Sequence, residues 1–137
     1  MRFSGKVEHI GKYWAIEVPI LGIATQGRSK KDAFIMMADA VETLVNKKGF
    51  SVDIYPGKGD YFEIGSGDEA TLAAFLLKRE RLKSGLSLAE VAARLGIRSI
   101  NGYARYEQGR SMPSFKQLGK IFSALTPTHD FVISESM

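Results

Sequence analysis

The chain has 137 residues, of which 45% are apolar and 25% are charged, the composition of an ordinary globular protein with one domain or two small ones. It has no cysteine and two histidines, which excludes a disulfide framework and a thiolate metal site, and we expect no metal or cofactor. No apolar run approaches the roughly 20 residues of a membrane span, and the N-terminus lacks the apolar segment of a signal peptide, so we expect a cytoplasmic protein.

The formal net charge of +4 is distributed unevenly along the chain. Residues 1–70 contain nine Lys/Arg and ten Asp/Glu, whereas residues 71–137 contain ten Lys/Arg and five Asp/Glu. A near-neutral half joined to a basic half indicates that only the second half binds a polyanion such as DNA. The alternative is a basic surface that is simply solvated, and charge alone does not decide between the two.

The first half alternates between strand and helix patterns. Apolar alternation and aromatic or β-branched residues predict strands over residues 2–9, 13–18 and 23–26. Ser29 is followed three residues later by Asp32, the capping-box spacing, which predicts a helix that ends at Gly49. Residues 50–55 and 61–65 then form a predicted hairpin. The apolar stripe expected for the helix comprises Ala33, Met36, Met37, Ala40, Val41, Leu44 and Val45.

The segment Gly65-Ser66-Gly67-Asp68 is polar and flexible in composition, and both the periodicity and the charge change across it. We therefore expect two domains, residues 1–66 and residues 70–137. The predicted fold class is an α+β first domain, with an antiparallel sheet and one helix, followed by an all-α second domain.

A helix-turn-helix is predicted within residues 87–109. Ser87 and Glu90 have capping-box spacing, and Gly96 stops the helix that they begin. A second short helix should start at about Ser99 and bury Ile100, Tyr103 or Tyr106. Further helices are predicted over residues 71–83 and 114–125. Two short helices joined by a glycine-containing turn are typical of the helix-turn-helix. The apolar face of the first helix comprises Leu88, Val91, Ala92 and Leu95.

The sequence GLSLAEVAARLGI followed by ARYEQGRSMPSFKQLGKIFSAL closely resembles the Xre/Cro family of phage-repressor-like DNA-binding domains. The stretch between Ile97 and Glu107 is one residue longer than the common family spacing, which leaves the register of base contacts open. The matching features, in chain order, are Gly85 before the cap, Ala92, Gly96-Ile97 at the turn, Tyr106-Glu107-Gln108-Gly109 and Pro113-Ser114.

This resemblance implies a DNA site at the start of the second helix of the motif, which faces the major groove. Arg and Asn side chains can make bidentate bonds to guanine and adenine respectively. The backbone amides at Ser87 suit a phosphate, and Arg110 and Lys116 are further phosphate partners. The alternative for each basic residue is a solvated charge. The candidate base-contacting residues are Arg98, Ser99, Asn101 and Gly102, with Arg105 one turn on.

The first half resembles the HicB antitoxin family through the segment YWAIEVPILGIATQGRSKKDAFIMMADAVETLV. There a strand ends in Pro, a Leu-Gly pair and a Thr-Gln-Gly triplet follow, and an Ala-rich helix begins after Ser or Thr. The matching residues here are Pro19, Leu21-Gly22, Thr25-Gln26-Gly27 and Ser29, but Ile20 stands where an acidic residue often follows the Pro. The resemblance implies a partial RNase H-like fold.

The resemblance also implies a partner, a small basic HicA-like toxin that cleaves mRNA and whose catalytic surface is masked by this domain. A near-neutral or acidic domain complements a basic toxin. Candidate contacts are Tyr13, Trp14 and Tyr61 as aromatic anchors, and Glu17. Strand alternation places Tyr13 and Trp14 on opposite faces, and which of the two is in the core stays open.

A nuclease is the catalytic alternative for this domain, because such enzymes gather carboxylates around two metal ions. Helical and strand-edge spacing favours solvated or capping carboxylates instead, so we expect no enzyme. The carboxylates considered were Glu17, Asp32, Asp39, Glu42, Asp53 and Glu63.

These patterns together predict a HicB-type antitoxin that represses its own operon through a helix-turn-helix. The helical half is expected to dimerise, because two-fold operators favour two-fold proteins. The tail segment Phe131-Val132-Ile133 either pairs as a strand across the two-fold axis or packs on its own domain. Two rivals remain, a plain repressor with a ligand-sensing first domain and a metal-dependent RNase.

Overall fold

The computed structural model describes residues 1–136 and divides into two compact units, which are treated separately below. The main part of the first unit is Met1–Leu72, and the second unit is Ala73–Ser134. The division falls within helix α2 (Glu69–Lys83). None of the helices in residues 1–136 is long and apolar enough to cross a membrane.

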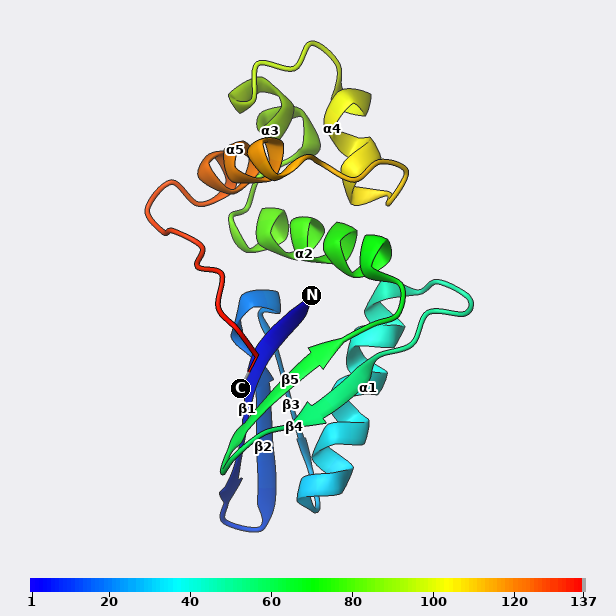
Figure 1. Ribbon diagram of the computed structural model, residues 1–137, viewed down its shortest axis with the longest axis vertical. Helices are drawn as coiled ribbons and strands as arrows, with labels where there is room; N and C mark the ends of the chain where they lie inside the picture. The colour runs from blue at the N-terminus through cyan, green and yellow to red at the C-terminus, as the bar shows by residue number, and fades with distance from the viewer. Residues whose placement is uncertain (137) are drawn as a thin grey trace. The chain divides into compact units, whose positions relative to one another are not determined.

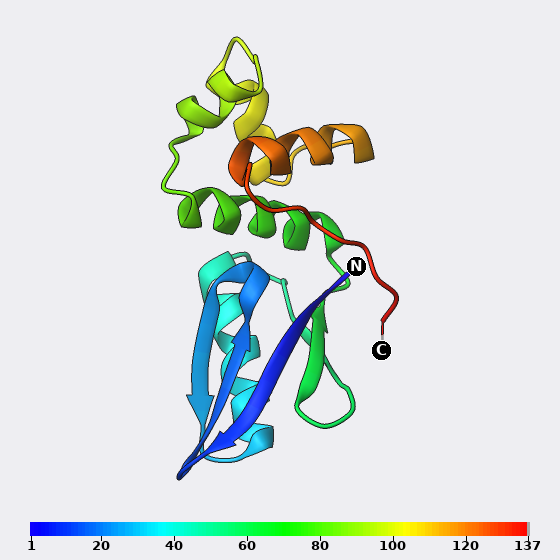
Figure 2. The ribbon, with the colours of Figure 1, turned by 90° about the vertical axis from the view of Figure 1, so that its left-hand side faces the viewer.

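The first unit is an antiparallel sheet with one helix packed on one face (Figure 1). Within the described residues the sheet has five strands in the order β3-β2-β1-β5-β4, and α1 (Lys30–Val45) runs along it (Figure 2). A short 3₁₀ turn, η1 (Pro19–Leu21), precedes the edge strand. The strands are β1 (Arg2–Ile10), β2 (Tyr13–Val18), β3 (Ile23–Gly27), β4 (Asp53–Pro56) and β5 (Tyr61–Gly65).

The core of this unit lies between the sheet and α1. Successive side chains of a strand point to opposite faces, so every second residue of β1, β2 and β5 is buried while the residues between them stay at the surface. This pattern confirms an α+β first domain with an antiparallel sheet and one helix. The RNase H-like relationship stays a prediction. The buried residues include Phe3, Val7, Ile16, Val18, Phe62 and Ile64 from the sheet and Ala33, Met37 and Val41 from α1.

Helix α1 begins where the capping pattern predicts and ends earlier than expected. The Ser29 hydroxyl accepts a hydrogen bond from the Asp32 backbone N–H at 3.0 Å. Asn46 adopts a left-handed conformation, with φ of 51°, and the helix stops there rather than at Gly49. Asn tolerates this conformation better than most residues, since its short polar side chain bonds locally. The predicted end of the helix was therefore wrong.

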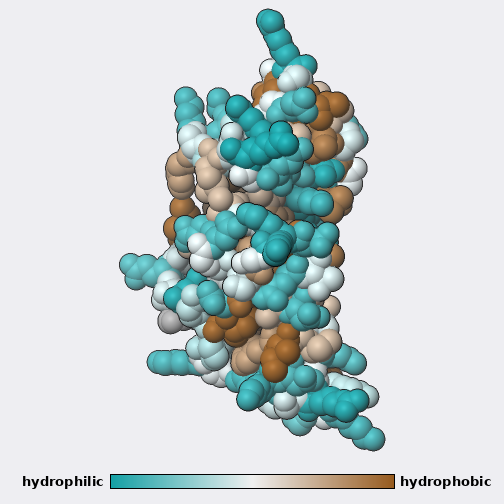
Figure 3. Space-filling model, turned by 90° about the vertical axis from the view of Figure 1, so that its right-hand side faces the viewer, coloured by the Kyte–Doolittle hydropathy of each residue, from teal (hydrophilic) through white to brown (hydrophobic). Residues whose placement is uncertain are grey.

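The apolar stripe of α1 is narrower than its sequence suggests. Met36 and Leu44 were expected in the core, but their side chains are exposed, as is that of Ile35. A single helix on a sheet buries only the residues directly above the strands, which here excludes positions on its flank. The space-filling view shows apolar side chains reaching the surface over α1 (Figure 3).

Strand β4 is shorter than the predicted segment of residues 50–55. The Phe50 N–H donates to the Lys47 carbonyl in a turn, and Phe50 itself is buried. The Val52 N–H donates to the Glu42 carboxylate on α1 at 2.9 Å. Because this amide bonds to a helix side chain, it is not available to a sheet ladder, and regular strand pairing starts at Asp53.

The second unit is helical, as predicted. It contains most of α2 together with α3 (Leu88–Arg94), α4 (Ile100–Glu107) and α5 (Phe115–Leu125). The hydroxyls of Ser87, Ser99 and Ser114 each accept from the backbone N–H three residues on, which fixes the three helix starts. One core joins the helices, comprising Leu77, Val91, Ala92, Tyr103, Tyr106, Ile121 and Leu125.

The tail after α5 packs partly on its own unit. The Phe131 ring stacks on the Phe122 ring of α5, with centroids 3.9 Å apart. Val132 and Ile133 are 88% and 82% exposed. The structure therefore favours tail packing for Phe131, while strand pairing across a two-fold axis stays a prediction.

Gly27 offers a test of the contact between β3 and α1. A Cβ at Gly27 would overlap the backbone of Ala33, in the first turn of α1. We expect Gly27→Ala to lower the free energy of unfolding by about 1–3 kcal/mol, because backbone has to shift to admit the methyl group. Gly67→Ala is the matched control, since a Cβ there meets nothing within 4 Å. Equal denaturant midpoints for the two variants would contradict this packing.

Candidate functional site

Helix α4 is held in place by a buried ion pair. The Arg81 guanidinium on α2 donates from Nε and Nη2 to the two carboxylate oxygens of Glu107, at 2.8 and 3.0 Å. Its Nη1 donates to the Leu86 carbonyl at 3.0 Å. The two side chains are only 12% and 6% exposed. One guanidinium therefore fixes the last residue of α4, helix α2 and the loop that leads into α3.

The pKa values of Arg81 and of the neighbouring Tyr103 are both raised. Hydrogen bonding to Glu107 raises the pKa of Arg81 above its usual value. Burial, reinforced by the Glu107 carboxylate, raises the pKa of the Tyr103 phenol. The Tyr103 ring also lies edge-on to the Tyr106 ring, at 6.5 Å between centroids. We conclude that Tyr103 and Tyr106 hold α4 in the core and are unavailable for base stacking.

The turn between α3 and α4 is closed by Gly96 and Ile97. Gly96 has a φ of 69°, and the Ile97 N–H returns to the Ala92 carbonyl at 2.9 Å. Ile97 then packs toward the core and against Gly102, where an added Cβ would overlap the Ile97 side chain. Gly102 was predicted to face DNA, but this close packing gives it a structural role.

The loop from α3 leads into the first turn of α4 (Figures 1 and 2), and polar residues around this turn are exposed. Arg98 and Asn101 are exposed. Ser99 is exposed as well, but its hydroxyl already accepts from the Gly102 N–H at 3.2 Å as the helix cap. Arg98 and Asn101 are therefore the better placed of these residues for base edges.

Arg105 lies one turn further along α4 and folds back on its own helix. Its Nε donates to the Gly102 carbonyl at 3.2 Å, and its Nη2 contacts the Tyr106 hydroxyl at 3.3 Å. The guanidinium carbon lies 5.0 Å from the Tyr106 ring centroid. These are exposed or marginal contacts, so the side chain can exchange them for bonds to a base.

The residues predicted to contact phosphates differ in whether they are free to do so. Ser87 is engaged in a complete capping box, in which its N–H donates to the Glu90 carboxylate at 3.2 Å. Its own amide is thus occupied, contrary to the expectation that it is free for a phosphate. Arg110, after α4, and Lys116, in the first turn of α5, are both exposed. They remain candidates for phosphate contacts.

Ile100 is exposed, although its sequence position predicts a buried residue. The sequence placed it among the core residues of α4, but its side chain is 48% exposed. Helical spacing alone assigns it to the same face as Tyr103 and Ala104, which are buried.

Three of the four predicted protein-contact residues share the open face of the sheet, which α1 does not cover. In the strand register Lys6 of β1 pairs with Glu17 of β2 on one side and with Tyr61 of β5 on the other. Tyr13 is on the same face as Glu17, four residues earlier in β2. Tyr13 and Tyr61 are 49% and 53% exposed. They form one continuous surface with Lys6 and Glu17.

Trp14 belongs to the opposite face of the sheet. Its ring stacks on the His9 ring at 4.8 Å, with an interplanar angle of 11°, and it is partly buried. Since His9 and Trp14 alternate with the open-face residues, Trp14 does not share a surface with Tyr13. The two rings lie on opposite faces, as strand alternation predicts, and Trp14 is the one on the core side. A contact between Trp14 and a protein partner stays a prediction.

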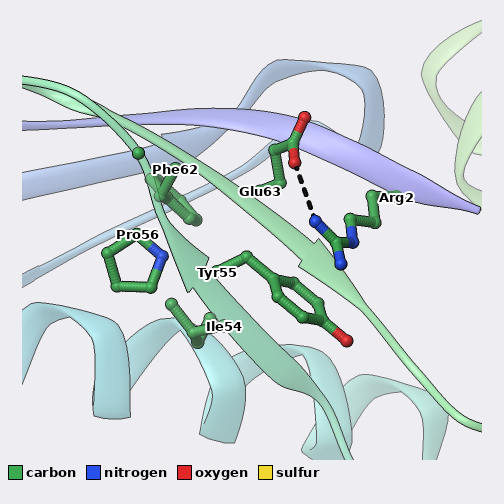
Figure 4. Close-up of a pocket in the computed structure, with 7 residues that line it drawn as sticks. Arg2, Ile54, Tyr55, Pro56, Phe62 and Glu63 are labelled. Carbon is green, nitrogen blue, oxygen red and sulfur yellow. Dashed lines mark hydrogen bonds and ion pairs between the residues drawn. The ribbon is translucent and has the colours of Figure 1, made fainter. Parts of the chain in front are cut away.

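The open face has two shallow hollows. The first lies over Ala15 and Ala24, whose small side chains leave space between Glu8, Glu17 and Lys6. The Lys6 ammonium is 3.4 Å from the Glu8 carboxylate, and this contact raises the pKa of Lys6. The second hollow lies beside β4 and β5, where Arg2 is paired with Glu63 and covers the Tyr55 ring (Figure 4).

The carboxylates of the first unit lie apart from one another, and several of them already accept hydrogen bonds. Asp32 accepts from the Arg28 N–H, Glu42 from the Val52 N–H, and Glu63 from Arg2. Among residues 1–136, no group of three or more His, Asp or Glu side chains is arranged to hold a metal ion.

Comparison with known protein families gives a match that lies mainly in the second unit. The sequence of residues 72–126 matches a family of helix-turn-helix domains. Residues 72–126 form a helix-turn-helix domain. The match covers less than half of the chain, and comparison with curated proteins gives no match. The helix-turn-helix domain points to DNA as a partner and to transcription regulation as the role.

The Arg81–Glu107 pair gives a direct test of how α4 is held. We expect Glu107→Ala to lower the free energy of unfolding of the helical unit by about 3–5 kcal/mol, because it leaves the Arg81 charge buried without a partner. The double variant Arg81→Met/Glu107→Leu should recover most of this loss, since no buried charge remains. Denaturant unfolding, monitored by near-ultraviolet circular dichroism, measures the stability of the single and the double variant. A single variant as stable as the wild type would contradict a buried, unscreened pair.

Proposed function

We propose that this protein is a transcriptional repressor that binds operator DNA through its helix-turn-helix domain and a small basic protein through its sheet unit. The observation that carries the proposal is the exposed first turn of α4, whose opposite end is fixed by Arg81 and Glu107. In a helix-turn-helix, this is the part of the second helix that enters the major groove.

Base reading falls to Arg98, Asn101 and Arg105 in this proposal. All three are exposed, and their side chains match guanine or adenine edges in the major groove. Arg110 and Lys116 position the domain through phosphates. The charge supports this assignment, because residues 73–134 contain ten Lys/Arg and four Asp/Glu.

We place the dimer contact on α5 and the tail. Phe115 is 78% exposed, and together with Leu118, Phe122 and Phe131 it lines an apolar groove. Ile133 lines the same groove, so the surface contains both a recess and exposed apolar side chains that can enter the recess of a second copy. A dimer of this kind presents two α4 helices to two half-sites.

The partner of the sheet unit is proposed to be a HicA-like mRNA-cleaving toxin, which makes the chain an antitoxin. The open face supports this choice, because Tyr13 and Tyr61 supply exposed aromatic area and Glu8 and Glu17 border a hollow that suits a basic side chain. We further propose that the unit acts by covering the toxin and not by catalysis. The partial RNase H-like relationship belongs to the same proposal.

DNA binding is tested by variants of α4. We expect Asn101→Ala or Arg105→Ala to weaken operator binding by about 1–3 kcal/mol and to relax the preference at one base pair, with little effect on random DNA. Lys116→Ala should weaken both DNAs alike and reduce the salt dependence of binding. Fluorescence anisotropy at two salt concentrations distinguishes the loss of base reading from the loss of a phosphate contact. Equal losses on operator and random DNA for Asn101→Ala would remove its base-reading role.

The protein interface is tested by charge reversal on the open face. The probe is a small basic HicA-like protein, co-expressed with this chain. Glu17→Lys combined with Tyr61→Ala should weaken the complex by at least about 2 kcal/mol, as expected for central contacts of an interface. Asp39→Lys, an equal charge change on the exposed side of α1, is the control.

Calorimetry of the purified proteins measures affinity, and growth of the co-expressing cells reports neutralisation. If the Asp39→Lys variant loses binding while the open-face variant keeps it, the partner docks on α1 instead. If the basic protein does not bind the wild-type chain or either variant while operator binding is intact, the result would favour a plain repressor.

A further inference from the structure

Ile100 is an apolar side chain in a polar part of the surface. It lies in the first turn of α4, between the cap residue Ser99 and the exposed Asn101, and Arg98 is exposed nearby. Its side chain is 48% exposed, although it is β-branched and apolar. Burial in the core therefore does not account for this residue.

The packing around the turn leaves Ile100 free to contact a ligand. Ile97 takes the core position of this segment, where it packs against Gly102 and the cluster of Val91, Tyr103 and Tyr106. The apolar packing that α4 needs is thus supplied by Ile97 and the two tyrosines, and Ile100 adds a branched apolar surface on the outside.

The chemistry of the major groove identifies what such a side chain can recognise. Base edges there present hydrogen-bond donors and acceptors, and the one apolar group among them is the 5-methyl group of thymine. Ile100 has no donor or acceptor in its side chain and lies among residues that enter the groove. A thymine methyl group is the base feature that it can contact favourably.

We propose that Ile100 packs against the 5-methyl group of a thymine in each operator half-site, and so makes thymine the preferred base at that position. This inference rests on the proposed DNA binding of α4. Adjacent helical residues point about 100° apart, so Ile100 and Asn101 contact different base pairs. Ile100 then selects thymine by its methyl group while Asn101 selects adenine by hydrogen bonds.

The experiment removes the methyl group and nothing else. The full chain first selects its preferred sequence from a random duplex library. Each thymine of that sequence is then replaced in turn by deoxyuridine, which keeps every hydrogen-bonding group. We expect one position per half-site at which the replacement weakens binding about fourfold, the factor that corresponds to burial of one methyl group.

Variants of Ile100 link this loss to the side chain. Ile100→Ala should bind the thymine operator about as weakly as the wild type binds the deoxyuridine operator, and should no longer distinguish the two DNAs. Ile100→Val should keep most of the discrimination, since it retains a branched apolar surface. Ile35→Ala on α1, which removes an isoleucine of similar exposure (57%), is the control and should discriminate like the wild type.

The outcomes distinguish the role of Ile100 from the DNA binding of α4. Specific binding with no sensitivity to deoxyuridine at any position, or with equal sensitivity in the wild type and Ile100→Ala, overturns the role of Ile100 and leaves DNA binding by α4 intact. Failure to select any sequence overturns the DNA-binding function itself, and the role of Ile100 with it. Thermal unfolding of each variant checks that the helical unit is folded.

Discussion

The helical unit depends on the ion pair between Arg81 and Glu107. It joins residues 26 positions apart and ties in the Leu86 carbonyl, so that a single guanidinium determines where α2, the start of α3 and the end of α4 lie. Because Glu107 is the last residue of α4, the helix is held at one end and its first turn projects outward. Arg98 and Asn101, at the start of the helix, are exposed, and we propose that they read a DNA major groove.

The sheet unit follows from a different constraint. A strand directs alternate residues to opposite faces, and α1 covers only one of them. The covered face forms the core, and the other face must remain in solvent unless a partner binds it. That open face is unusual in carrying exposed Tyr13 and Tyr61 beside Glu17. Each unit therefore has an inner surface that provides stability and an outer surface for which we propose a partner, DNA for the helical unit and a basic protein for the sheet unit.

Local signals in the sequence predicted most of the elements. The starts of α3, α4 and α5 followed from Ser87, Ser99 and Ser114, since each cap is a contact between residues three apart. The errors arose where a distant contact decides the outcome. The bond from the Val52 N–H to Glu42 delays β4, and Ile97, which packs on Gly102, takes the core position in place of Ile100. Neither pairing can be read from spacing along the chain.

The same limit applies to the sites. The candidate DNA-reading turn could be proposed from the sequence because its residues are contiguous, whereas the face to which Trp14 points required the strand register. The central claim, that the first turn of α4 is the DNA-reading surface, is tested most directly by amide hydrogen exchange of the full chain with and without its selected duplex. Exchange should slow within residues 97–107 and remain unchanged in β1, β2 and β5. Protection of the sheet strands, with no change in α4, would contradict the account.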